Sequence, residues 1–187
     1  MNIIIWHILE SDKFRPVSLQ HFIHEVLFAI PISLSWWSAK VIADLHNKRH
    51  TIPADILPTS DRPDLTIVDY TKKTIHIFEL TVPYESNIDR QHIYKSNKYA
   101  ALMSDLELTG FRVTCCAFEI GCRGTITKDN FYRLSEFVES VNIKERKTVK
   151  TLCKDLMKIS CLCSFYIFKS KDHPEWEQMD VLKANFK

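Results

Sequence analysis

Two short runs decide the fold: Arg62-Pro63-Asp64-Leu65-Thr66-Ile67-Val68-Asp69-Tyr70 and Ile75-His76-Ile77-Phe78-Glu79-Leu80-Thr81. Both are rich in β-branched residues, which predicts strands at about 64–70 and 74–82. Asp64 opens the first run and Glu79 closes the second. Side chains alternate along a strand, so a hairpin loop with an even number of residues places the two acids on one face. An odd loop without a bulge would place them on opposite faces. We expect the even loop.

The surrounding elements are expected from periodicity and from residues that cap or end helices. A helix is predicted to begin at Asn87 or Asp89, to run to about Leu108 and to end at Gly110. A third strand at 111–120 would follow this crossover helix, and a tight turn at 121–124 would follow the strand. Further helices are predicted at 20–30, from 33 or 35 to about 46, from Thr127 or Asp129 to about 141, and at 143–158, with a loop at 47–63.

These elements predict an α/β fold, with a mixed sheet and helices on both faces. The first two strands would pair antiparallel, and the third would join through the helical crossover. At 187 residues the chain is expected to form one domain, 1–187, with its core at about 18–141 and a C-terminal helical extension at about 142–187.

Composition limits the partners and the compartment. The net charge of +2 permits a DNA partner only through local basic patches. The six cysteines include no CxxC pair, which favours buried thiols in a reducing compartment. No stretch has the character of a signal peptide or of a transmembrane helix. We therefore expect a nuclear or cytoplasmic protein without a membrane partner.

Asp64 and Glu79 together would suit Mg²⁺, a hard cation that prefers oxygen ligands and keeps several waters. Glu79 lies in the apolar run 75–82, where a buried charge needs a partner or a metal. The alternative is structural: Asp64 would cap a strand, and Glu79 would be a lone charge at a sheet edge.

The sequence resembles the PD-(D/E)xK nuclease pattern, because Arg62-Pro63-Asp64 is followed, after fourteen residues, by Glu79-Leu80-Thr81. The longer series, which adds Val82-Pro83-Tyr84-Glu85, Lys98-Tyr99 and Gly121-Cys122-Arg123-Gly124, is similar to one branch of that superfamily. The branch is the restriction-like endonuclease domain of reverse transcriptases from early-branching, site-specific non-LTR retrotransposons. The resemblance covers roughly residues 20–126 and implies a restriction-endonuclease-like sheet.

By this resemblance Asp64 and Glu79 would be catalytic ligands of Mg²⁺ or Mn²⁺. Thr81 stands where the superfamily usually has its lysine. In this branch the lysine comes from the following helix, which matches Lys95 or Lys98, and we favour Lys95.

The branch also places a histidine-acid pair on its first helix, where Glu25 follows His24 and would be a third acid near the metal. Ile23 replaces the usual arginine at this point. Arg62, Arg123, Lys48 and Arg49 are the candidate contacts to nucleic acid; solvent-exposed loop residues are the alternative for the last two.

The resulting hypothesis is a metal-dependent DNA endonuclease whose nick supplies a 3′-hydroxyl for target-primed reverse transcription, with a reverse transcriptase or its RNA as a further partner. Two alternatives stay open. One is a catalytically inactive nuclease-fold relic that binds DNA or protein. The other is a zinc or redox protein that uses the cysteines and histidines.

Overall fold

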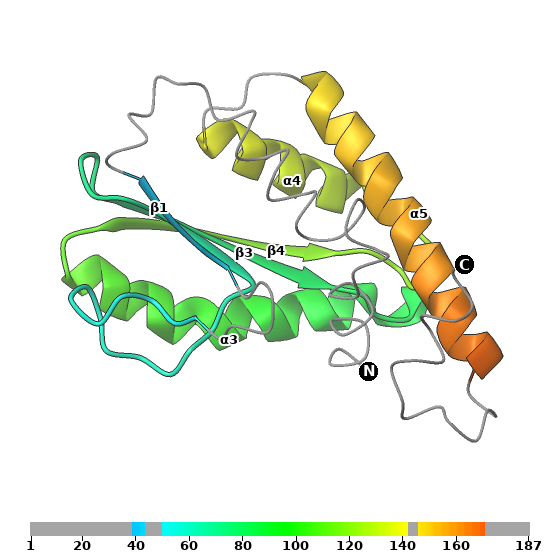
Figure 1. The fold of residues 1–187 in the computed structure, drawn as a ribbon, viewed down its shortest axis with the longest axis horizontal. Helices are drawn as coiled ribbons and strands as arrows, with labels where there is room; N and C mark the ends of the chain where they lie inside the picture. Colours follow the sequence, from blue (N-terminus) through cyan, green and yellow to red (C-terminus); the bar gives the residue numbers. More distant parts are fainter. Residues whose placement is uncertain (1–38, 44–49, 142–145, 171–187) are drawn as a thin grey trace.

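The computed structural model describes residues 39–43, 50–141 and 146–170 (Figure 1). The helix predicted at 20–30 lies outside these residues. In the described part, one mixed sheet has the strand order β1-β2-β3-β4, with α3 on one face and α4 on the other (Figure 1). This arrangement confirms the predicted α/β fold class. The elements are β1 (Ala39–Ala43), β2 (Leu65–Asp69), β3 (Thr74–Thr81), the 3₁₀ turn η2 (Glu85–Asn87), α3 (Ile88–Leu108), β4 (Arg112–Glu119), α4 (Lys128–Ser140) and α5 (Arg146–Ser170).

The hairpin of β2 and β3 has the predicted parity. The strands are antiparallel, with Leu65 opposite Phe78 and Asp69 opposite Thr74. The loop therefore holds residues 70–73, an even number. The carboxylate of Asp69 accepts two backbone N–H bonds from this loop at 2.9 Å each, which fixes the turn.

The helix predicted from 33 or 35 to about 46 is wrong over residues 39–43. These five residues form β1, antiparallel to β2, with Ala39 opposite Asp69 and Ala43 opposite Leu65. A segment of five residues fits both the helical and the strand period of apolar residues, so the pairing with β2 determines that it forms a strand. Pairing with β2 satisfies the backbone groups of β1, and the β-branched Val41 and Ile42 suit a pleated surface.

The predicted crossover from β3 to β4 is confirmed. The two strands are parallel, with Thr74 opposite Arg112 and Thr81 opposite Glu119. Helix α3 connects them along one face of the sheet, and Gly110 follows its end with a φ of 86°. The spacing of the buried positions gives α3 one sheet-facing stripe, formed by Ile88, Lys95, Tyr99, Leu102 and Leu106.

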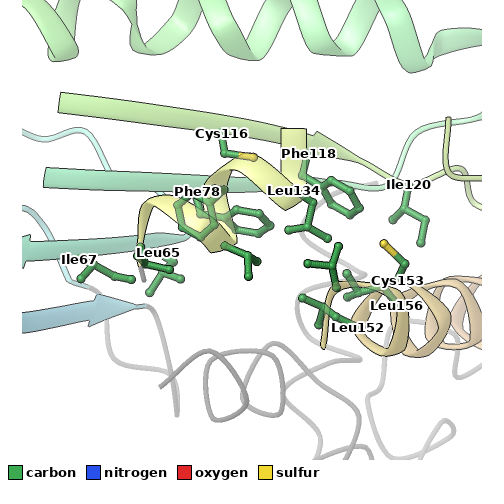
Figure 2. Close-up of a cluster of buried hydrophobic side chains, with 14 of the residues drawn as sticks. Leu65, Ile67, Phe78, Cys116, Phe118, Ile120, Leu134, Leu152, Cys153 and Leu156 are labelled. Atoms are coloured by element: carbon green, nitrogen blue, oxygen red, sulfur yellow. The ribbon is translucent and has the colours of Figure 1, made fainter. Parts of the chain in front are cut away.

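Alternation along the strands divides the core into two clusters, one on each face of the sheet. The first cluster lies between the sheet, α4 and α5 (Figure 2). Phe78 lies within it, with its ring centroid 5.1 Å from that of Phe137 on α4. The second cluster lies under α3 and contains Val68, Ile75, Ile77, Tyr99, Leu102 and Leu106, among others.

Helix α5 is longer than predicted, because the apolar run after residue 158 continues the helix to Ser170. It packs on the tight turn at 121–124, which the sequence predicted. Ser160 Oγ donates a hydrogen bond to the carbonyl oxygen of Gly121 at 2.7 Å, and Cys161 Sγ donates one to the carbonyl oxygen of Arg123 at 2.8 Å. Hydrogen bonds from α5 therefore stabilise the turn, in addition to the bond within it from Gly124 N–H to Gly121 O at 2.7 Å.

Among the described helices, none is both long enough and apolar enough to cross a lipid bilayer.

Two glycines with positive φ offer a test of how closely α5 packs on this turn. A Cβ on Gly124 (φ 83°) would lie 2.7 Å from Cys161 Sγ and 2.9 Å from Met157 O, whereas Gly110 (φ 86°) has open space there. Gly110→Ala should cost only the backbone strain, about 1–2 kcal/mol. Gly124→Ala should cost more, because α5 must move away. Urea unfolding of both variants checks this, and equal losses of stability would contradict the close packing.

Candidate active site

Asp64 and Glu79 face each other at the open end of the β2–β3 hairpin. Leu65 pairs with Phe78, so the next residue outward on each strand brings Asp64 opposite Glu79. Each carboxylate also binds the backbone beside the other: Glu79 Oε2 accepts from Asp64 N at 3.2 Å, and Asp64 Oδ2 accepts from Leu80 N at 2.8 Å. The predicted meeting of the two acids is thus present in the structure.

Glu79 is buried, with 3% of its surface exposed, and α3 supplies its partners. Lys95 Nζ donates to Glu79 Oε1, and Tyr99 OH donates to Glu79 Oε2 at 2.9 Å. Lys95 and Tyr99 are four residues apart and therefore lie on the same face of α3. The helix consequently brings one cation and one hydroxyl to the same carboxylate.

The second candidate lysine lies farther from the acids. Lys98 is exposed, and its Nζ donates to Tyr99 OH at 2.8 Å and lies 4.5 Å from the centre of the Tyr99 ring. It therefore reaches Glu79 only through Tyr99. Of the two lysines, Lys95 is the one whose ammonium group contacts a candidate metal ligand.

Burial raises the pKa of Asp64 to about 8, and the negative charge of Glu79 adds to the rise. The Leu80 N–H bond, Lys95 and Lys98 oppose it only partly. Two acids this close disfavour each other's ionised form, and a divalent cation between them would relieve that repulsion. Asp64 itself is half-buried, whereas Glu79 is buried.

The donor set fits a hard cation. Mg²⁺ commonly binds through one or two carboxylates and completes its octahedron with water and substrate phosphate. The described residues contain no group of three or more histidine, cysteine, aspartate or glutamate side chains that could hold a metal ion. Asp64 and Glu79 are the two carboxylates that could contribute ligands at this point. Glu25, the predicted third acid, lies outside the described residues.

The candidate nucleic-acid contacts are separated in the structure. The backbone oxygen of Arg62 lies 3.4 Å from Tyr99 OH, which places this residue beside the acids. Arg123 lies on the turn at 121–124, where its Nε donates to Glu85 Oε2 at 3.0 Å and its side chain is 70% exposed. Lys48 and Arg49 lie outside the described residues.

Sequence reasoning missed two features of this region. Tyr99 holds Glu79, a role for which only its helical spacing from Lys95 gave a signal. Glu119, at the end of β4, is completely buried and hydrogen-bonded to His92 on α3. Glu119 interrupts the apolar run 111–120, and a charge in such a run is the same signal that singled out Glu79.

The chain matches no protein-family model and no curated protein. Among solved structures it is similar to an N-terminal domain of a reptarenavirus L protein, with 16% sequence identity and a TM-score of 0.31. The match covers 58% of this chain and 60% of the viral one, less than two thirds of that structure. A similarity of this size assigns neither a fold family nor a function.

The raised pKa of Asp64 predicts a pH-dependent stability. Its carboxyl group keeps a proton in the folded state well above its ordinary pKa of 3.8. The stability that this adds is full below about pH 4 and is lost as the pH rises through about 8. Asp64→Asn removes the titration, so it should gain stability relative to wild type as the pH rises from about 4 to about 8 in EDTA.

Urea unfolding across this pH range measures the difference. Asp105→Asn, at an exposed aspartate of α3, is the matched control and should follow wild type. A constant difference between Asp64→Asn and wild type at all pH values would show that the Asp64 carboxyl is not perturbed.

Proposed function

We propose that this chain is a metal-dependent DNA endonuclease of the restriction-like, PD-(D/E)xK type. The main support is the placement of Asp64 opposite Glu79 with the Lys95 ammonium group on the Glu79 carboxylate. Two acids and a lysine are a constellation suited to phosphodiester hydrolysis, because the reaction needs a bound cation, an activated water and a positive charge at the phosphate. The sequence resemblance points to the same residues.

Each side chain has a role in this proposal. Asp64 and Glu79 would hold Mg²⁺ or Mn²⁺, which would supply Lewis-acid stabilisation of the phosphate when bound. To serve as a ligand, Asp64 would give up its proton, because metal ligands must be deprotonated. Lys95 places a positive charge where the phosphate gains negative charge. Tyr99 keeps Glu79 in position through its hydroxyl group.

The biological setting follows from the longer motif series. We propose that the nick leaves a 3′-hydroxyl that primes reverse transcription, with DNA as substrate and a reverse transcriptase or its RNA as partner. The proposed location of the protein is the nucleus or the cytoplasm.

A second candidate is a non-catalytic module that keeps the fold and binds DNA or protein. The supporting observation is that both oxygens of Glu79 already accept hydrogen bonds, from Lys95 and from Tyr99. Thr81 at the usual lysine position points the same way. In this case Lys95 and Glu79 would form a structural ion pair.

Nicking of supercoiled plasmid in Mg²⁺ or Mn²⁺ tests the proposal. Wild type should convert supercoiled DNA to open circles, and EDTA should stop it. Asp64→Asn, Glu79→Gln and Lys95→Ala should each lower the rate by at least about 100-fold. The first two variants remove a metal ligand, and the third removes the positive charge at the phosphate. Lys98→Ala is the matched control on the same helix and should lose far less.

Circular dichroism must accompany the rates, because removing one partner of a buried ion pair costs about 3–5 kcal/mol. Wild-type protein that binds duplex DNA but never cuts it would favour the non-catalytic module. Equal rates for Lys95→Ala and Lys98→Ala would remove Lys95 from the mechanism.

A further inference from the structure

A second buried carboxylate lies beside the candidate active site. Glu119 has a completely buried side chain at the end of β4. Its register partner is Thr81 of β3, which is two residues after Glu79 and therefore on the same face of the sheet. Glu79 and Glu119 thus form a row of acids along the face that α3 covers.

Side chains from two helices fix Glu119. On α4, Asn130 Nδ2 donates to the Glu119 backbone oxygen at 2.7 Å, and Arg133 Nη2 donates to Oε2 at 3.4 Å. On α3, His92 Nδ1 lies 3.2 Å from Oε1. Burial raises the pKa of Glu119, and its hydrogen bonds with His92 and Arg133 oppose the rise.

The contact with Glu119 sets the tautomer of His92. An ionised carboxylate only accepts hydrogen bonds, so Nδ1 of His92 carries the proton that it donates. In neutral His92 the other ring nitrogen, Nε2, then has a free lone pair. A histidine oriented by a buried acid in this way is the arrangement that proteins use for proton acceptors.

Helix α3 brings His92 next to the proposed catalytic lysine. His92 is three residues before Lys95, so the two side chains are neighbours on one helix face. Its side chain is 28% exposed, which leaves the ring accessible from solvent. Between the two acids, the buried hydroxyl of Thr81 has no hydrogen-bond partner among the described residues. A substrate oxygen or a water bound there would satisfy it.

We propose that His92 is a catalytic residue of the nuclease reaction, with Nε2 as the general base for the attacking water and Glu119 as its positioning residue. This inference rests on the proposed function. Water oxygen bonds to phosphorus while one of its protons passes to His92 Nε2. The P–O3′ bond breaks, and the 3′ oxygen leaves with the electron pair and takes a proton from solvent. His92 then returns its proton to solvent.

The first test is independent of activity. ¹⁵N–¹H NMR of the full chain, in EDTA, reads the tautomer of His92. Neutral His92 should carry its proton on Nδ1, and Glu119→Gln should shift the population toward the Nε2–H form that free histidine prefers. A wild-type His92 with its proton on Nε2 would overturn the proposal whether or not the protein cuts DNA.

The second test uses the plasmid-nicking rate in Mg²⁺. His92→Ala should lower the maximal rate at least tenfold with little change in the DNA concentration needed for half-maximal rate, and added imidazole should restore part of the loss. Glu119→Gln should also slow the maximal rate, and imidazole should not rescue it. His76→Ala is the matched control, because His76 bonds to Thr114 at the far end of the sheet.

The outcomes separate the two proposals. Nicking by wild type with a His92→Ala rate equal to that of wild type would refute the general base and leave the nuclease intact. Loss of activity without imidazole rescue would make His92 a structural partner of Glu119 only. Absence of nicking by wild type would end both proposals, and the Nδ1–H tautomer would then report only a structural hydrogen bond between His92 and Glu119.

Discussion

The buried contact between Lys95 and Glu79 is the interaction on which the rest of this site depends. An ionised glutamate inside a sheet is costly unless a partner compensates its charge. Here the compensation comes from α3, whose own buried residues Tyr99, Leu102 and Leu106 pack the helix against the sheet. The hairpin register then brings Asp64 to the same point. The crossover helix therefore does more than connect parallel strands, because it carries the positive charge that makes two neighbouring acids tolerable.

Local patterns were sufficient for the part of the fold around this contact. Alternation in the two strands predicted the hairpin, and the loop parity follows from the requirement that Asp64 and Glu79 share a face. Thr127 was an expected helix cap, and its side chain accepts from Asn130 N at 3.1 Å. The strand at 39–43 could not be predicted, since five residues fit both periods and only the edge of β2 decides between them. The extent of α5 likewise depends on its packing against the turn at 121–124.

The candidate active site was likewise predictable from the sequence only in part. Asp64, Glu79 and Lys95 were predictable because each breaks a local rule or falls at a motif spacing. The pair of His92 and Glu119 was not, because it joins residues 27 apart in sequence on a helix and a strand whose packing angle no local pattern specifies. Glu119 nevertheless carried a usable signal as a charge in an apolar strand. Searching each predicted strand for such charges, and each neighbouring helix for a cation or histidine to match, would have found it.

The proposed function requires that the carboxylates of Asp64 and Glu79 share one divalent cation. The most direct measurement is anomalous diffraction from crystals of the protein soaked in Mn²⁺. We expect a peak between the two carboxylates, within coordination distance of an oxygen of each, and its loss in Glu79→Gln. Mn²⁺ bound only elsewhere, with the Lys95 contact to Glu79 unchanged, would refute the shared metal site and leave that contact as a structural ion pair.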